Sequence, residues 1–165
     1  MDYLEQLVSE WYEYQGYFVR RDLWVGLESD GSYECELDVV AYHPTKHHLV
    51  QIEPSLAIFD WEEQESHFRL KFDAGQKYLH RFFGGEPSPG LEQIALVLFM
   101  DVEHRDTVAG GRVVHVRELL AEIFQALVSF GISSYLIPEQ WPLLRTLQLV
   151  AEFRDTLSES LSKRR

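Results

Sequence analysis

YECELDVVAYHPTKHHLVQIEPS, residues 33–55, carries the pattern from which the rest of the fold can be inferred. In its first part, apolar side chains at Cys35, Leu37 and Val39 alternate with acidic ones, which is the period of a β-strand with one polar face. A polar turn at 43–48 separates this run from a second alternating run at 49–55. The stretch therefore predicts two neighbouring strands joined by a short turn.

Two carboxylates fall at matching places in this predicted pair of strands. Asp38 lies on the first strand and Glu53 on the second, and the turn returns the chain so that the two come close together. Neighbouring carboxylates repel one another and destabilise a fold unless a cation lies between them. Because Mg²⁺ prefers oxygen ligands, the pair predicts a Mg²⁺ site, with Mn²⁺ as the alternative ion.

The pattern of these residues resembles the PD-(D/E)XK, or restriction-endonuclease-like, nuclease superfamily. In that superfamily an Asp on one strand and a Glu-x-Lys on the next build the active site; Asp38 matches the Asp and Glu53 the Glu. Ser55 stands where the motif has its Lys. The resemblance implies a three-layer α/β/α domain with a central mixed sheet, and a metal held by Asp38, Glu53 and the carbonyl of Pro54. It also implies hydrolysis of phosphodiester bonds in nucleic acid, with DNA expected ahead of RNA.

The missing Lys has two candidate replacements on a helix predicted to begin at or near Asp60. In the resembled superfamily some active-site groups migrate to a neighbouring element, so Lys71 or Lys77 could take the place of the motif Lys, with Lys71 the first choice. Its role there would be to stabilise negative charge on a phosphate or to position the attacking water. The alternative is that both are ordinary surface lysines of a helix.

Residues 2–15 predict an amphipathic helix, with Asp2 as its cap and Gly16 at its end. Members of the resembled superfamily often aim a Glu from the first helix at the metal. Glu5 is the candidate for that role, followed by Glu10, and the alternative is that both are solvated helix carboxylates.

The order of elements around the motif predicts one α/β domain spanning 1–165, with a core over about 1–130 and a helical extension over about 131–165. The other predicted elements are a strand at 17–26, a turn at 28–32, a loop at 84–90, a buried strand within 91–100, a polar loop at 101–111, a strand at 113–116 and a helix at 117–130. The apolar residues late in the chain leave open a protein partner or a homodimer through the C-terminal segment, although packing within the chain is commoner.

Composition limits the possible classes of protein. A formal net charge of −12 argues against a general nucleic-acid coat protein, which needs basic surface, but it does not exclude a nuclease. A lone cysteine, Cys35, excludes a disulfide framework within the chain and suits a reducing cytoplasm. No apolar run long enough to span a membrane is present, and the N-terminal residues do not predict a signal peptide.

Other functional readings have weaker support in the sequence. A restriction-endonuclease-like domain that has lost catalysis and binds nucleic acid or protein is the main alternative, because Ser55 replaces the Lys and the chain is acidic. A zinc site using Cys35, His47 and His48 matches no known ligand spacing. A structural or assembly protein that uses the Leu-rich tail is a third reading.

Overall fold

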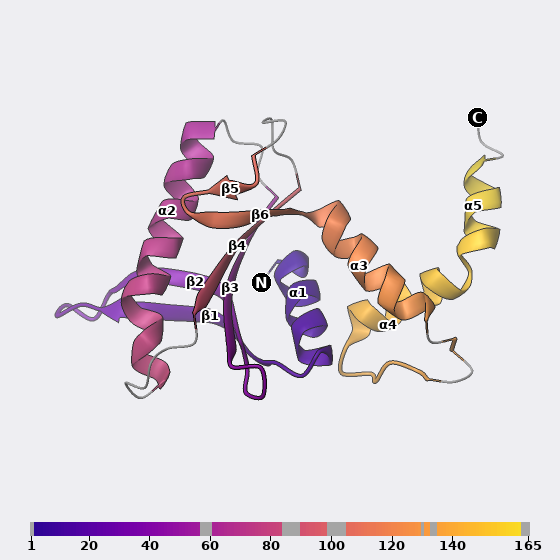
Figure 1. Cartoon of the computed structure of the whole chain (residues 1–165), viewed down its shortest axis with the longest axis horizontal. Helices are drawn as coiled ribbons and strands as arrows, with labels where there is room; N and C mark the ends of the chain where they lie inside the picture. The colour runs from indigo at the N-terminus through magenta and orange to yellow at the C-terminus, as the bar shows by residue number, and fades with distance from the viewer. Residues whose placement is uncertain are drawn as a thin grey trace. The chain divides into compact units, whose positions relative to one another are not determined.

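The computed structural model describes residues 2–56, 61–83, 90–98, 105–129, 131–132 and 135–162 of the chain. In this part the chain forms an α/β structure with five α-helices and one six-stranded mixed sheet, which confirms the predicted α/β class (Figure 1). The chain divides into two compact units, Met1–Val116 and Arg117–Arg165.

The sheet belongs to the first unit and has the strand order β1-β2-β3-β4-β6-β5. Its first three strands form an antiparallel meander, β4 pairs in parallel with both β3 and β6, and β5 pairs antiparallel with β6. The strands are β1 (Phe18–Leu27), β2 (Tyr33–His43), β3 (His48–Ser55), β4 (Leu91–Val97), β5 (Thr107–Val108) and β6 (Gly111–His115). The predicted strand pair and its turn are therefore confirmed as β2 and β3.

Two helices lie on opposite faces of this sheet (Figure 1). One is α1 (Tyr3–Tyr14), whose predicted cap is confirmed: Asp2 accepts a hydrogen bond from the backbone N–H of Leu4, and Glu5 completes a capping box. The other is α2 (Trp61–Tyr78), which supplies the crossover that a parallel β3–β4 pair requires. The residue at which α2 was predicted to begin, Asp60, lies outside the described residues.

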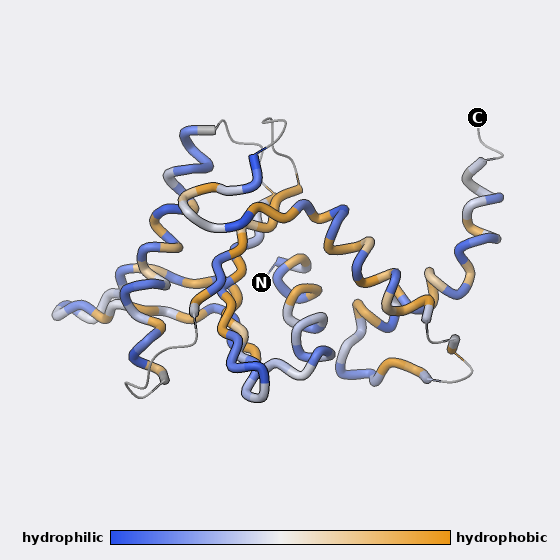
Figure 2. Tube along the Cα trace, viewed as in Figure 1, coloured by the Kyte–Doolittle hydropathy of each residue, from blue (hydrophilic) through white to orange (hydrophobic). Residues whose placement is uncertain are grey.

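The central strands β3 and β4 are buried along most of their length, whereas β1 is exposed at alternate positions. Figure 2 shows hydrophobic residues in the central part of the sheet. On the α2 side, the rings of Phe68 and Phe72 stack with their centroids 5.8 Å apart and pack against β4 and β6. At its C-terminal end, α2 continues into a short 3-10 helix, η1 (Leu79–Phe83). A long helix thus covers the strands that carry Asp38 and Glu53.

Two predicted boundaries differ from the structure. The loop predicted at 101–111 contains β5, because the turn at Ala109 and Gly110, both with positive φ, folds Thr107–Val108 back onto β6. This two-residue strand is too short to give a periodic signal. The buried strand predicted within 91–100 ends at Val97, and residues 99–104 lie outside the described part.

The second unit contains α3 (Val116–Val128), α4 (Pro142–Glu152) and α5 (Arg154–Ser162). Side-chain bonds of Gln148 hold the segment before α4: its amide accepts from the N–H of Ile137 at 3.0 Å and donates to the carbonyl of Tyr135 at 2.7 Å. Several apolar side chains in this region are exposed, among them Leu149, Phe153 and Leu157. No described helix is both long and apolar enough to cross a membrane.

Candidate active site

The meander brings the two predicted carboxylates together. Val39 of β2 pairs with Ile52 of β3, so the next position places Asp38 opposite Glu53. The backbone N–H of Asp38 lies 3.3 Å from Oε2 of Glu53 and donates to it. Glu53 has no exposed surface, whereas the Asp38 side chain keeps 17 % of its surface exposed. The carboxylate pair is therefore largely buried and meets solvent on the Asp38 side only.

Lys71 of α2 supplies the cation at this pair. Its Nζ lies 2.5 Å from Oδ1 of Asp38 and 3.3 Å from Oε2 of Glu53, and 14 % of its side chain is exposed. The lysine that the sequence placed first therefore lies where it touches both carboxylates, although it comes from the crossover helix rather than from β3. Ser55, at the motif position of the Lys, remains buried in β3.

The charges at the site do not balance, because two carboxylates share one ammonium. Burial raises the pKa of Glu53, and the nearby Asp38 carboxylate raises it further. Burial opposes the charge of Lys71, but Glu53 and Asp38 outweigh it, so the pKa of Lys71 is raised and its amine stays protonated. The site therefore has a deficit of positive charge that a second cation, or a proton on Glu53, can satisfy.

A row of buried amides holds the other oxygen of Glu53. Gln51 Nε2 donates to Glu53 Oε1 at 2.8 Å, and Gln51 Oε1 accepts from Gln93 Nε2 of β4, also at 2.8 Å. Gln93 in turn accepts from Gln76 of α2 at 3.0 Å and donates to the backbone carbonyl of Phe72. With one oxygen held by Gln51, Glu53 is fixed with its second oxygen directed at Asp38 and Lys71.

Glu5 lies within electrostatic reach of the site but bonds elsewhere. Its carboxylate accepts the N–H of Asp2 at 3.2 Å as part of the capping box. Burial raises the pKa of Glu5, and Asp38 and Asp22 add to the rise. Glu10, the second candidate, is buried in α1 and accepts from Gln6 at 2.9 Å.

Lys77 is not brought to the carboxylate pair. It donates to Glu34 Oε2 at 2.7 Å at the surface, and this hydrogen bond raises the pKa of Lys77. The role of the Pro54 carbonyl as a metal ligand stays a prediction; Pro54 lies in β3 and pairs with Leu96 of β4.

Two residues near the site were missed by the sequence analysis. His67 lies one helical turn before Lys71 on α2; burial and Lys71 lower the pKa of His67, while Asp38 opposes that shift. The i, i+4 spacing of His67 and Lys71 was the available signal. Gln51 gave no signal, because its partner Gln93 is 42 residues away and meets it only through the parallel β3–β4 pair.

Because burial raises the pKa of Glu53, the stability of the fold depends on pH. Because the pKa is raised in the folded state, its contribution to stability is complete below the ordinary pKa of glutamate and is lost as pH rises through the raised value. In chelator, we expect the free energy of unfolding to fall with rising pH by at most about 1.4 kcal/mol per pH unit. Glu53→Gln should flatten the profile and be the more stable protein at alkaline pH.

Urea unfolding at a series of pH values measures this dependence. Glu159→Gln, a change at an exposed carboxylate of α5, is the control and should leave the profile as in the wild type. A Glu53→Gln profile parallel to that of the wild type would show that Glu53 does not bind the proton.

Comparison with protein-family models, with curated proteins and with solved structures finds no match to this chain. The function is therefore inferred from the side chains of the described residues, above all from the arrangement of Asp38, Glu53 and Lys71.

Proposed function

We propose that this protein is a Mg²⁺-dependent nuclease of the restriction-endonuclease-like type, which hydrolyses phosphodiester bonds of nucleic acid. One observation carries the proposal: a buried Glu and a partly exposed Asp on adjacent strands converge on one Lys, whose Nζ lies 2.5 Å from Asp38 Oδ1 and 3.3 Å from Glu53 Oε2. The order of elements supports it, since α1, the β1–β2–β3 meander, α2 and the parallel strand β4 follow one another as in that fold.

The residues present fit a magnesium ion bound through few protein ligands. Mg²⁺ commonly takes one or two carboxylates and fills its remaining positions with waters and substrate phosphate oxygens. Asp38 and Glu53 provide that number, and among the described residues no cluster of three or more acidic, His or Cys side chains forms a fuller cage. When bound, the metal would acidify a water and offset charge on the phosphate.

Each protein group has a distinct task in this scheme. Asp38 and Glu53 would hold the cation, and Gln51 would keep Glu53 in its orientation through the 2.8 Å hydrogen bond. Lys71 would move its ammonium from the carboxylates to the scissile phosphate and stabilise the charge that develops there. His67, whose pKa is lowered, would be neutral near pH 7 and able to accept a proton.

Calorimetry with Mg²⁺ and Mn²⁺ tests the metal site, and cleavage of labelled DNA and RNA tests the activity. We expect the wild type to bind metal, and Asp38→Ala to lose both metal binding and cleavage, the latter by at least about 100-fold. Asp155→Ala, at an exposed acid of α5, is the control and should retain both. Binding that survives in Asp38→Ala, or cleavage that persists in it, would contradict the proposal.

A second candidate function is a binding module of the same fold without catalysis. Ser55 at the motif position of the Lys and the net charge of −12 favour it. In that case the protein would bind nucleic acid or a protein partner with Asp38→Ala as well as the wild type does, and neither would cleave.

A further inference from the structure

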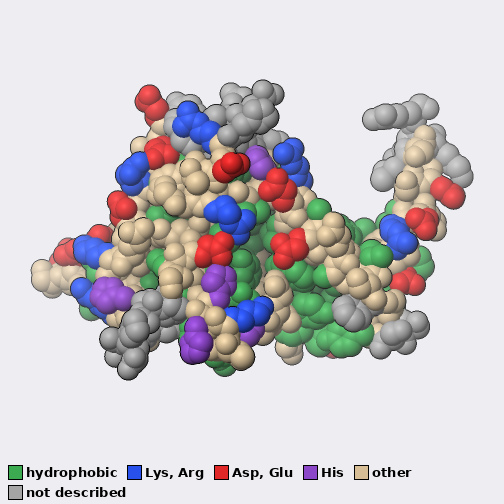
Figure 3. Space-filling view, viewed as in Figure 1, with side chains coloured by type: hydrophobic (Ala, Val, Ile, Leu, Met, Phe, Trp, Pro, Cys, Tyr) green, Lys and Arg blue, Asp and Glu red, His purple; other side chains and the backbone are tan. Residues whose placement is uncertain are grey.

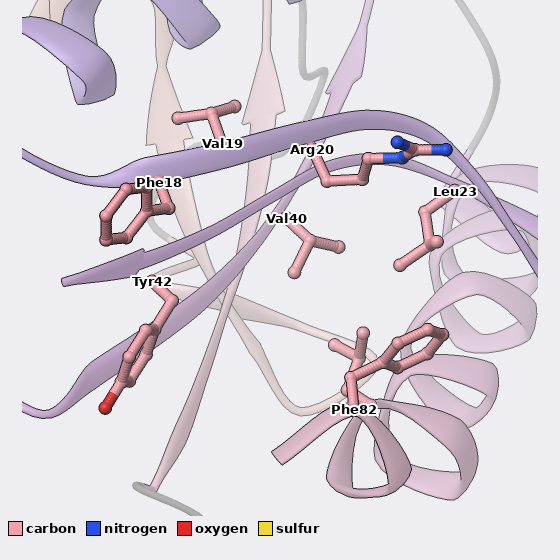
Figure 4. A pocket seen from close by; sticks show the side chains of 8 residues that line it. Phe18, Val19, Arg20, Leu23, Val40, Tyr42 and Phe82 are labelled. Carbon is pink, nitrogen blue, oxygen red and sulfur yellow. The ribbon is translucent and has the colours of Figure 1, made fainter. Parts of the chain in front are cut away.

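A second feature of the first unit is an apolar pocket on the α2 side of the sheet. It has a volume of about 430 Å³, within the usual range for sites that enclose a small ligand. Its lining residues come from β1, β2 and η1: Phe18, Val19, Arg20, Leu23, Val40, Tyr42, Leu79 and Phe82. Figure 4 shows Phe82 across the cavity from the side chains of β1 and β2.

Two aromatic rings of this pocket are exposed to solvent rather than packed. Phe18 keeps 73 % of its surface exposed and Phe82 keeps 59 %. Tyr42 adds a third ring, beside Phe18, because the two residues pair across β1 and β2. Exposed rings around an apolar hollow are suited to the flat face of another ring, since stacking then buries apolar area on both partners.

Two arginines bring positive charge to the pocket in an otherwise acidic protein. Other basic side chains nearby are paired with acids: Lys77 with Glu34 and His48 with Glu92. Arg20 lines the pocket itself, and Arg81 lies beside Phe82 with its guanidinium 5.1 Å from the centroid of the Tyr78 ring. Figure 3 shows His together with Lys or Arg side chains along the lower edge of this unit. Such a rim is complementary to an anion.

We propose that this pocket binds one unpaired base of a nucleic-acid strand, which stacks against Phe18 and Phe82 while Arg20 contacts the adjoining phosphate. This inference rests on the proposed function, because it names the part of the nucleic acid that the protein recognises. Val40, in the pocket, lies two residues from Asp38 along β2, a rise of about 6.7 Å. The bound base would therefore lie close to the carboxylate pair, and the substrate would be single-stranded nucleic acid or a duplex with an unpaired base.

Fluorescence anisotropy of the full chain in EDTA tests this binding without any contribution from metal or cleavage. The probes are an oligothymidine of about twelve nucleotides, a length that one protein site can cover, and a blunt duplex of equal length. We expect Phe82→Ala to weaken binding of the single strand by about 5- to 150-fold, the usual loss for one stacked base. Arg20→Gln should reduce the slope of log affinity against log salt by about 0.7, the value for one phosphate contact to a single strand.

Matched controls separate stacking from general effects of mutation. Phe153→Ala removes a ring at the C-cap of α4 with nearly the same exposure, 57 %, and Arg112→Gln removes a surface arginine that is paired with Glu92. Both should bind the oligothymidine as the wild type does. Thermal unfolding shows whether Phe82→Ala folds, and Arg20→Gln, an exposed change, gives an independent test.

Three results would overturn the proposal. They are a wild type that does not bind the single strand, a Phe82→Ala or Arg20→Gln protein that binds it as the wild type does, and thymidine monophosphate that competes as well as the oligonucleotide. The last would indicate a site for free nucleotides. If Asp38→Ala loses metal binding while Phe82→Ala binds the single strand normally, the pocket assignment fails and the nuclease proposal stands. If Asp38→Ala keeps metal binding while Phe82→Ala loses single-strand binding, the pocket assignment stands and the catalytic site is rejected.

Discussion

Lys71→Met is expected to lower the free energy of unfolding by roughly 3–5 kcal/mol, the usual effect of removing one partner from a buried ion pair. Methionine keeps most of the apolar stem, so the change removes mainly the ammonium. Without it, the Asp38 and Glu53 carboxylates lie side by side with no cation between them, and Glu53 has no exposure to water. Urea unfolding in EDTA measures the loss.

Two further variants test whether this loss of stability comes from the unpaired carboxylates. Lys77→Met, from the same helix, breaks an exposed pair with Glu34 and should leave the unfolding midpoint nearly unchanged. Adding Glu53→Gln to Lys71→Met removes one of the two negative charges that repel each other and should restore much of the stability. Equal losses for Lys71→Met and Lys77→Met would show that the carboxylate pair does not need its ammonium.

Gly75→Ala is expected to destabilise the protein by between about 1 and 5 kcal/mol, although the same change inside an exposed helix stabilises by roughly 1 kcal/mol. A Cβ at Gly75 would lie 1.8 Å from Gln51 Oε1 and 2.7 Å from its Cδ. The end of a glutamine usually moves aside at little cost. Gln51, however, is fully buried and bonded to Glu53, Gln93 and the carbonyl of Lys71.

The same substitution should also weaken metal binding, because a displaced Gln51 no longer orients Glu53. Calorimetric titration with Mn²⁺ and thermal unfolding measure the two effects. Gly90→Ala is the matched control, since an added Cβ there meets no atom within 4 Å. The double change Gln51→Ala with Gly75→Ala should recover stability relative to Gly75→Ala. A Gly75→Ala protein with a higher melting temperature than the wild type would show that Gln51 has room to move.

Much of the first unit follows from local sequence patterns. Alternation of apolar and acidic residues predicts β2, the polar turn predicts the reversal, and Asp2 with Glu5 predicts the start of α1; each is present. The parts of the fold that the sequence did not predict also have physical causes. Strand β5 has only two residues, too few for a period, and it exists because a turn with positive φ at Ala109 and Gly110 returns it to β6.

The sequence by itself determined that Asp38 and Glu53 would meet, because both belong to one hairpin whose register is set by alternation and by its short turn. Only the tertiary structure decided which lysine joins them. Lys71 and Lys77 differ by six residues on one helix, so the rotation and crossing of α2 over the sheet bring Lys71 to the pair and Lys77 to Glu34. The Gln51–Gln93 bond and the aromatic pocket likewise depend on contacts between elements far apart in the chain, which no local period encodes.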